Sequence, residues 1–396
     1  MRPFQPRRAR LALVHRLAES RRLRGGAVFH GHHNTNQVLP LGLGLALLTG
    51  AAPFTRGKLR VPRETVEVVP RIWPRESEVL RVVTRHLPEV PRCLADLGDR
   101  SLHVFRPGRS LAEAAPDGVG DELLRALAGF FARTARIPAG ELPPRPDGWP
   151  DDGDSGGFLR RLAAFTEDRV HRPNRARFGS LFDDVLVPRN AMTSFARSLP
   201  GLTSRPFRLL HTDVHRANVI ALPAGGLAVI DWELALYGDP LHDLATHLVR
   251  MGYGESERER MTVLWESAMR ASGQTALTAG LAEDLPVYLA FEHAQSVYPD
   301  VMRAALALPR RPDDGQFADA ARRTCVAVGL ASGPLRLPEV PDPERTEKAL
   351  RTWHAEDVAV HGRRDPEPAG GDGASAYTAD AYTAGAYGSD AYGAGA

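Results

Sequence analysis

The residues best suited to chemistry are two carboxylates and an amide that lie close together in the sequence. Asp213 and Asn218 belong to the segment 211–218 (HTDVHRAN), and Asp231 belongs to the segment 230–233 (IDWE). Transfer of a phosphoryl group needs one group that orients the incoming hydroxyl and oxygen ligands that hold Mg²⁺ against nucleotide phosphates. These side chains supply a carboxylate that could orient the hydroxyl and oxygen ligands that could hold Mg²⁺. Their types and spacing together therefore indicate phosphoryl transfer.

Short apolar segments on both sides of these residues predict β-strands. They cover residues 207–210, 219–222 and 227–230, and a Gly225-Gly226 turn precedes the last of them. The polar residues therefore fall at strand ends and on the loop between strands. A loop that is held by a rigid sheet keeps its backbone fixed while its side chains stay accessible, as a catalytic loop requires.

These segments resemble the catalytic and metal-binding loops of the aminoglycoside phosphotransferase and choline kinase family. Its members act on small molecules and are related to the protein kinases. The similarity continues through residues 238–245 (GDPLHDLA), although Thr212 stands where the family more often has Gly. The resemblance implies that Asp213 is the catalytic base or hydroxyl-orienting group. It also implies that Asn218 and Asp231 bind Mg²⁺.

The same resemblance implies supporting roles for three neighbouring residues. Asp243 is expected to brace the catalytic loop, and Glu233 is expected to assist the metal or the substrate. His211 is interpreted as a buried histidine that braces its own loop. The implied fold is α+β and bilobal, as in protein kinases, with a small β-rich N-lobe that has one main helix and a larger, mostly helical C-lobe.

A nucleotide site requires a turn over the phosphates upstream of the catalytic loop. Residues 25–38 predict a strand, a Gly/Asn-rich turn and a second strand, and Gly31 with Asn34 matches the family's version of this turn. Such turns let backbone N–H groups approach phosphate oxygens. An ordinary hairpin is the alternative interpretation.

The cation expected at the phosphates is Lys58, because the chain uses lysine only at Lys58 and Lys348 and otherwise uses arginine. An ammonium group is compact enough for a slot beside two phosphates and a carboxylate. A chance surface lysine is the alternative, with Arg60 and Arg71 as substitutes for the role. The partner carboxylate should come from the next helix, where Glu76 and Glu78 both lie in the first turn.

The resemblance also places a hinge after the strand at residues 101–105, where the backbone around His103 and Phe105 would contact the adenine ring. The expected organisation has four parts: a basic amphipathic N-terminal extension (1–24), a nucleotide-binding N-lobe (25–105), a C-lobe with the catalytic loop, metal site and acceptor-binding helices (106–362), and a disordered low-complexity tail (363–396).

The acceptor is expected to bind among helices after Asp243. Tyr288 and Glu292 share one face at helical spacing and are candidates for stacking and charge-assisted hydrogen bonds. Ordinary core packing of this face is the alternative.

Composition agrees with a two-lobed enzyme of the cytoplasm. The chain has 396 residues, a net charge of +2 and two isolated cysteines, which exclude a disulfide framework. The apolar stretch 38–52 is too short to span a bilayer and is interpreted as a strand running into a turn. The basic N-terminus is interpreted as a helix packed on the small lobe, so neither a membrane nor a nucleic-acid partner is expected.

The sequence thus predicts a kinase that moves the γ-phosphate of ATP or GTP, with Mg²⁺, to a hydroxyl group of a small molecule. A catalytically silent binding module of the same fold is the first alternative. A metal-dependent hydrolase is the second, since histidines and aspartates between residues 211 and 243 resemble a ligand set for Zn²⁺ or Mn²⁺.

Overall fold

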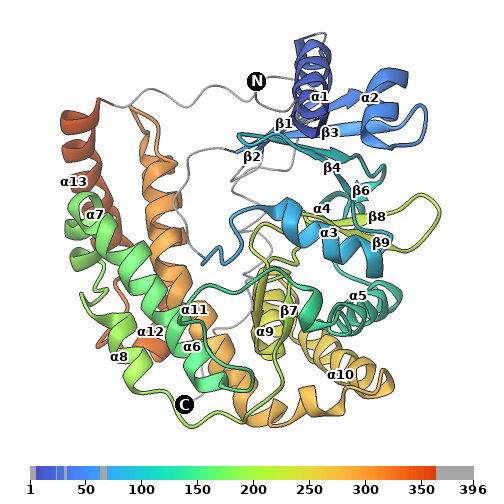
Figure 1. Cartoon of the computed structure of the whole chain (residues 1–396). Coiled ribbons are helices and arrows are strands. Elements are labelled where there is room, and N and C mark those ends of the chain that lie inside the picture. Colours follow the sequence, from blue (N-terminus) through green and yellow to red (C-terminus); the bar gives the residue numbers. More distant parts are fainter. Residues whose placement is uncertain (1–5, 24, 31–33, 63–68, 363–396) are drawn as a thin grey trace.

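The computed structural model describes residues 6–23, 25–30, 34–62 and 69–362. Figure 1 shows a smaller part with a sheet at the top and a larger, mainly helical part below and beside it. The expected turn residue Gly31 and the expected disordered tail at 363–396 lie outside the described residues.

An antiparallel sheet with the strand order β1-β2-β3-β5-β4 forms the smaller part. Its strands are β1 (Val28–His30), β2 (Asn34–Pro40), β3 (Arg56–Pro62), β4 (Cys93–Asp96) and β5 (Ser101–Val104). Within it, Lys58 of β3 pairs with Val38 on one side and with His103 on the other. Because side chains alternate along a strand, Lys58 and Arg60 point to the same face of the sheet.

The basic N-terminal segment forms helix α1 (Pro6–Leu23), which packs on this sheet. Val14 of α1 contributes to a small apolar core with Leu39, Leu59 and Leu102 of three strands. The sequence expectation of a packed amphipathic helix agrees with this contact.

The apolar stretch 38–52 differs from the expected strand and turn. β2 ends at Pro40, and helix α2 (Gly42–Thr49) follows directly. The backbone N–H of Leu41 donates to the carbonyl of Thr55 at 3.2 Å and so closes the segment at its base. Since almost every residue here is apolar, the sequence shows no helical period that could have predicted α2.

Helix α3 (Glu76–His86) begins after Pro74 and Arg75, where the proline and the acidic first turn predict a helix start. Its buried residues Val79 and Val83 belong to the large core that continues into the helical part. Helix α3 therefore connects the two parts of the molecule.

The larger part surrounds two short sheets with helices. The first sheet pairs β7 (Arg208–Leu210) with β10 (Leu236–Gly238), and the second places β8 (Val219–Ala221) between β6 (Arg109–Ser110) and β9 (Leu227–Val229). The segments 211–218 and 230–235 leave the ends of these strands as loops, as the sequence predicts.

The helices of this part are α4 (Leu111–Ala114), α5 (Asp121–Thr134), α6 (Ser155–Phe165), α7 (Arg172–Asp184), α8 (Ala191–Arg197), α9 (Pro240–Arg250), α10 (Glu255–Ala271), α11 (Leu281–Leu306), α12 (Asp314–Leu335) and α13 (Pro343–His361). Three short turns complete it: η1 (Ala139–Glu141), η2 (Thr166–His171) and η3 (Thr275–Thr278). Within the described ranges, every helix is too short or too polar to cross a bilayer.

A buried ion cluster connects the loop before β7 to α9 and α11. The guanidinium of Arg205 is fully buried and contacts Asp239 at 2.7 Å and Asp284 at 2.6 Å. The hydroxyl of Tyr288 donates to the same Asp239 carboxylate at 2.8 Å. Each buried charge therefore has a partner, which is the condition under which a buried ion is tolerated.

The replacement Arg205→Met should lower the free energy of unfolding by about 3–5 kcal/mol, because Asp239 and Asp284 would stay buried without their cation. Urea unfolding followed by tryptophan fluorescence measures this loss. Arg270→Met is the control, since Arg270 forms an exposed pair with Glu266 and should cost less than about 1 kcal/mol. Equal losses in the two variants would contradict the assigned role of the cluster.

Candidate active site

One face of helix α9 holds the loop that carries Asp213. Asp243 accepts hydrogen bonds from the backbone N–H groups of His211 at 3.0 Å and Thr212 at 2.7 Å. One turn later, Nδ1 of His247 donates to the carbonyl of Val214 at 2.8 Å. These contacts give Asp243 the bracing position that the sequence analysis expected.

A third residue of the same face reaches the candidate catalytic carboxylate itself. Nη1 of Arg250 donates to Oδ1 of Asp213 at 2.6 Å and to the carbonyl of Thr212 at 3.3 Å. Sequence reasoning missed Arg250. The available signal was its helical spacing from Asp243 and His247, which puts all three on one face.

Thr212 adopts a positive φ of 62°, a conformation that costs a β-branched residue free energy. This explains why a Gly is expected at the position. The strain is held by hydrogen bonds: the N–H of Thr212 donates to Asp243, and its hydroxyl donates to the carbonyl of Leu234 at 2.7 Å. Thr212 is fully buried, so no water can replace these bonds.

His211 connects the catalytic loop to the segment that carries Asp231. Its Nε2 donates to the carbonyl of Ile230 at 3.1 Å, and its Nδ1 accepts from the N–H of Asp213 at 3.2 Å. Burial lowers the pKa of His211 to about 4, which keeps the ring neutral and able to accept that second bond. The structure therefore places His211 in the bracing position that was expected.

Both oxygens of the Asp213 carboxylate have partners. Oδ1 faces Arg250, while Oδ2 accepts from Nδ2 of Asn218 at 2.9 Å and lies 3.5 Å from Nε2 of His215. Burial alone would raise the pKa of Asp213, but the charges of His215 and Arg250 and the hydrogen bond from His215 lower it well below its usual range. Asp213 is thus an oriented carboxylate that keeps its negative charge.

A buried guanidinium joins the sheet to the segment around Asp231. Arg60 contacts three carboxylates: Glu76 of α3 at 2.7 Å, Asp231 at 2.7 Å and Glu233 at 3.0 Å. Burial alone would lower the pKa of Arg60, but these carboxylates raise it above its usual range. Arg60 was named in the sequence analysis only as a substitute for Lys58.

Of the two candidate glutamates, Glu76 is the one that contacts this cation. Its other carboxylate oxygen, Oε1, accepts from the backbone N–H of Trp232 at 2.9 Å. The first turn of α3 is therefore bonded to both β3 and the residue after Asp231. Among the described residues, Glu78 makes no comparable contact.

Lys58 lies on the same sheet face but does not take the expected partner. Glu76 forms its ion pair with Arg60 and not with Lys58. Within the described part of the chain, the half-buried Lys58 has no ion-pair partner. Burial and the adjacent charge of Arg60 lower the pKa of Lys58, although Asp231 and Glu76 partly offset this. The expected pairing of Lys58 with a helix glutamate is therefore corrected to Arg60.

Glu233 and Asn34 bring the turn region close to the same cluster. Nδ2 of Asn34 donates to Oε1 of Glu233 at 3.2 Å, and Arg71 lies 3.4 Å from the other oxygen of Glu233. Burial and the charge of Asp231 raise the pKa of Glu233. The structure thus connects Asn34, at the start of β2, with Glu233, as a site shared by both parts requires.

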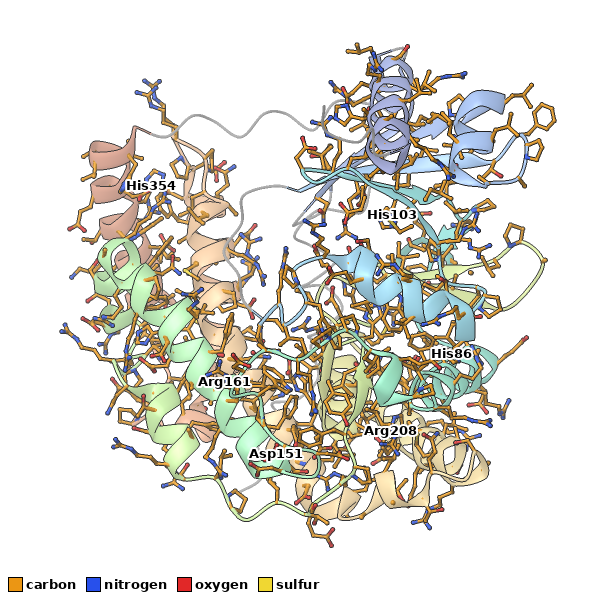
Figure 2. All side chains as sticks on the ribbon, in the orientation of Figure 1. His86, His103, Asp151, Arg161, Arg208 and His354 are labelled. Carbon is orange, nitrogen blue, oxygen red and sulfur yellow. The ribbon has the colours of Figure 1, made fainter. Side chains whose placement is uncertain are left out.

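The two expected hinge residues lie at the end of β5. Figure 2 shows His103 among the side chains of the upper sheet. His103 is buried, and its Nε2 forms a hydrogen bond of 2.7 Å with the hydroxyl of Ser101. Burial lowers the pKa of His103 to about 4. The N–H of Phe105 donates to the carbonyl of Arg56 at 2.9 Å. The expected contact of this backbone with an adenine ring stays a prediction.

Burial corrects the expectation that Tyr288 and Glu292 of α11 contact the acceptor. Tyr288 is fully buried, and its hydroxyl is bonded to Asp239. Glu292 is also fully buried, 3.8 Å from Arg250 and 3.5 Å from His242, and burial raises its pKa to about 7. Helical spacing identified the correct shared face, but that face points into the core.

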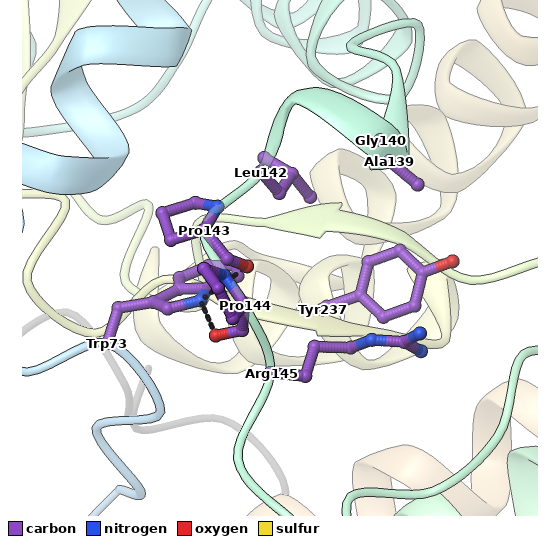
Figure 3. Close-up of a pocket in the computed structure, with 8 residues that line it drawn as sticks. All are labelled: Trp73, Ala139, Gly140, Leu142, Pro143, Pro144, Arg145 and Tyr237. Atoms are coloured by element: carbon purple, nitrogen blue, oxygen red, sulfur yellow. Dashed lines mark hydrogen bonds between the residues drawn. The ribbon is translucent and has the colours of Figure 1, made fainter.

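A pocket of about 370 Å³ lies away from these residues (Figure 3). Trp73 closes one side by donating its indole N–H to the carbonyls of Pro143 and Pro144 at 3.2 and 3.1 Å. On the other side the guanidinium of Arg145 lies 4.8 Å from the centre of the Tyr237 ring. None of the residues expected to be catalytic lines this pocket.

Asp231 and Asn218 are suitable ligands for Mg²⁺ by their chemistry. Mg²⁺ prefers oxygen ligands, and it commonly takes one or two from the protein and the others from phosphates and water. Within the described residues, no three His, Cys, Asp or Glu side chains come together as a metal site.

Comparisons with known proteins agree with this geometry. A family model described as the phosphotransferase enzyme family matches residues 58–274. A comparison with curated proteins gave no match.

Among solved structures, a protein described provisionally as an aminoglycoside phosphotransferase, from Ralstonia eutropha, has a TM-score of 0.50 and 15% identity, covering 82% of this chain and 97% of that one. A macrolide 2'-phosphotransferase from Brachybacterium faecium has a TM-score of 0.46 and 18% identity, with 83% and 99% covered. A choline/ethanolamine kinase family protein from Mesorhizobium loti has values of 0.45 and 16%, with 86% and 98% covered. The likeness to the first structure and the family match confirm the α+β, protein-kinase-like fold.

The hydroxyl of Thr212 can be tested with two substitutions. Thr212→Val keeps the side-chain shape but leaves the carbonyl of Leu234 without its donor, so the free energy of unfolding should fall by about 1–3 kcal/mol. Thr212→Ser keeps the donor and should stay within about 1 kcal/mol of the wild type. Urea unfolding of both variants measures the difference, and a Val variant as stable as the Ser variant would contradict the assigned bond.

Proposed function

The chain belongs to the phosphotransferase enzyme family, and we propose that it transfers the γ-phosphate of ATP or GTP to a hydroxyl group of a small molecule. The support that weighs most is one contact: Nδ2 of Asn218 donates to the Asp213 carboxylate at 2.9 Å. This bond places a metal-ligand candidate directly beside the group that faces the acceptor. The residues 25–105 then form the nucleotide-binding lobe, and 106–362 the lobe with the acceptor.

Asp213 orients the acceptor hydroxyl. Its pKa is held far below the usual range, so the carboxylate is charged, accepts a hydrogen bond from the hydroxyl first and takes the proton only late in the transfer. A phosphoryl transfer with a loose transition state suits such a group, because the hydroxyl loses its proton late. Arg250 and Asn218 fix the carboxylate and limit the directions from which the hydroxyl approaches.

In the transfer step, the acceptor oxygen forms a bond to the γ-phosphorus. The bond from this phosphorus to the oxygen bridging to the β-phosphate breaks, and the nucleoside diphosphate leaves with the electron pair. The hydroxyl proton passes to Asp213 as the new bond forms and then to solvent. Attack and departure occur in line, so positioning is the main contribution of the protein.

Asn218 and Asp231 would hold Mg²⁺, which when bound supplies positive charge at the phosphate oxygens. The contact between Asp231 and Arg60 sets where that carboxylate lies before a nucleotide binds. Arg60 is assigned to the phosphates because it also fixes Glu76 and Asp231, and Lys58 is the alternative on the same strand face. Both positions can be distinguished by substitution.

The role of Asp213 predicts a specific loss. Asp213→Asn keeps the size and the contact with Asn218, yet turnover should fall by about 10²–10⁴-fold because the hydroxyl is no longer oriented by a charge. Nucleotide affinity should remain within about threefold, since Asp213 faces the acceptor. The measurement combines a nucleotide titration with nucleoside diphosphate release in the presence of a panel of hydroxyl compounds, and Asp168→Asn on the exposed surface is the control.

Turnover that survives in Asp213→Asn would contradict the assigned role. Nucleotide binding that needs Mg²⁺, without diphosphate release for any compound of the panel, would favour the catalytically silent binding module. That alternative has one observation in its favour, because Asp213 and Asp231 each already contact an arginine.

The phosphate cation is tested by three variants. Arg60→Met should lower nucleotide affinity by at least about tenfold, and it should also destabilise the protein because three partly buried carboxylates lose the guanidinium that they share. Arg60→Lys keeps the charge and should restore part of both losses. Lys58→Met should change affinity by less than about threefold.

Isothermal titration with the nucleotide and Mg²⁺ measures these affinities at a temperature where all variants are folded. Loss of binding in Lys58→Met together with near-normal binding in Arg60→Lys would return the phosphate role to Lys58.

A further inference from the structure

The beginning of the chain has a charge distribution unlike the rest. Residues 1–62 contain eleven Lys and Arg side chains and a single acidic residue, Glu19, whereas the complete chain carries 50 basic and 48 acidic residues. The remaining sequence therefore has an excess of acids. Even without Arg60 and Lys58, which belong to the candidate active site, nine basic residues against one acidic residue indicate a partner that is negatively charged.

Exposed apolar side chains concentrate in the same region. Of the twelve large apolar side chains that are exposed in the described residues, seven lie between residues 11 and 54. They are Leu11, Leu13, Leu23, Val28, Leu43, Leu47 and Phe54. Scattered single leucines need no explanation, but a concentration of this kind marks an interaction surface.

Helix α2 and the loop after it carry the most exposed of these residues. Leu45 and Ala46 of α2 are buried, and Leu45 belongs to the small apolar core with Val14 of α1 and Leu39 of the sheet. Leu43 and Leu47 lie one turn apart on the outer face and are 63% and 80% exposed, and Phe54 is 89% exposed. The outer face of this helix is thus as apolar as its packed face, which an ordinary surface helix would not be.

Arginine side chains border this apolar surface. Nε of Arg10 donates to the carbonyl of Leu48 at 2.7 Å, and Nη2 of Arg92 donates to the carbonyl of Gly50 at 2.7 Å. Both guanidinium groups are therefore fixed at the C-terminal end of α2, beside Leu47. Arg16, which belongs to α1 as Arg10 does, is exposed as well.

We propose that α2 and the loop to Phe54 dock on an anionic lipid surface. Leu43, Leu47 and Phe54 enter the interface between headgroups and acyl chains, while Arg10 and Arg92 contact lipid phosphates. Figure 1 shows α1 and α2 at the top of the molecule, with α9 and α10 in its lower half. No membrane partner is expected from the sequence, where the apolar stretch 38–52 is too short to span a bilayer and the basic N-terminus is interpreted as a packed helix.

Other occupants fit this surface less well. A second copy would bring Arg10 and Arg92 of one chain close to the same two arginines of the other, and their charges would repel. Nucleic acid would use the arginines but not three exposed apolar side chains, because its affinity comes mainly from phosphate contacts. Lipid phosphates above an apolar layer match both features at once.

Flotation of the full chain with vesicles tests the docking. The protein should bind vesicles of phosphatidylcholine mixed with phosphatidylglycerol and not vesicles of phosphatidylcholine alone, and salt should weaken the binding. The triple variant Leu43→Ser, Leu47→Ser, Phe54→Ser should bind at least about tenfold more weakly. The matched control removes three exposed apolar residues elsewhere, Val263→Ser, Leu330→Ser, Val360→Ser, and should bind as the wild type does.

A second measurement reports on insertion directly. Phe54→Trp should give additional tryptophan emission that shifts to shorter wavelength with anionic vesicles, compared with the wild-type chain and its five tryptophans. No flotation, equal flotation with both lipids, or equal binding of the two triple variants would overturn the docking. Binding to polyglutamate without binding to vesicles, or a stable dimer in light scattering, would also overturn it in favour of a protein partner.

Discussion

The contact of one arginine with three carboxylates holds the candidate active site together. Arg60 comes from β3, Glu76 from α3, and Asp231 with Glu233 from the loop after β9. These segments are far apart in the sequence, and each carboxylate would be costly to bury alone. The guanidinium supplies donors for all of them in a fixed plane, which a lysine could not do. The position of Asp231 relative to the sheet therefore depends on Arg60.

A second constraint fixes the loop with Asp213 independently of the first. Helix α9 contacts this loop through Asp243, His247 and Arg250, and it can do so because the loop backbone turns sharply at Thr212. The positive φ of Thr212 costs about 1–3 kcal/mol, which the hydrogen bonds of its N–H and hydroxyl offset. The cluster around Arg60 thus positions Asp231, and helix α9 positions Asp213. His211 connects the two segments, because its ring donates to the carbonyl of Ile230.

The sequence predicted those parts of the site that are local in the chain. Asp213 and Asn218 lie on the segment between β7 and β8, and Asp231 lies on the loop after β9, as the apolar segments around them predict. The choice between Lys58 and Arg60 could not be made in this way, because both point to one face of β3 and only the position of α3 decides which meets Glu76. Helix α2 was missed for another reason, since a run that is apolar throughout shows no period.

A polar residue of α11 lies close to the arginine that holds Asp213. Periodicity showed that Tyr288 and Glu292 share a face, but not that this face packs against α9. Glu292 is instead close to Arg250, the residue that holds Asp213. A change of charge at Glu292 would therefore alter the surroundings of Arg250 and, through it, the direction of the Asp213 carboxylate. Helix α11 is thus coupled through Arg250 to the loop that carries Asp213.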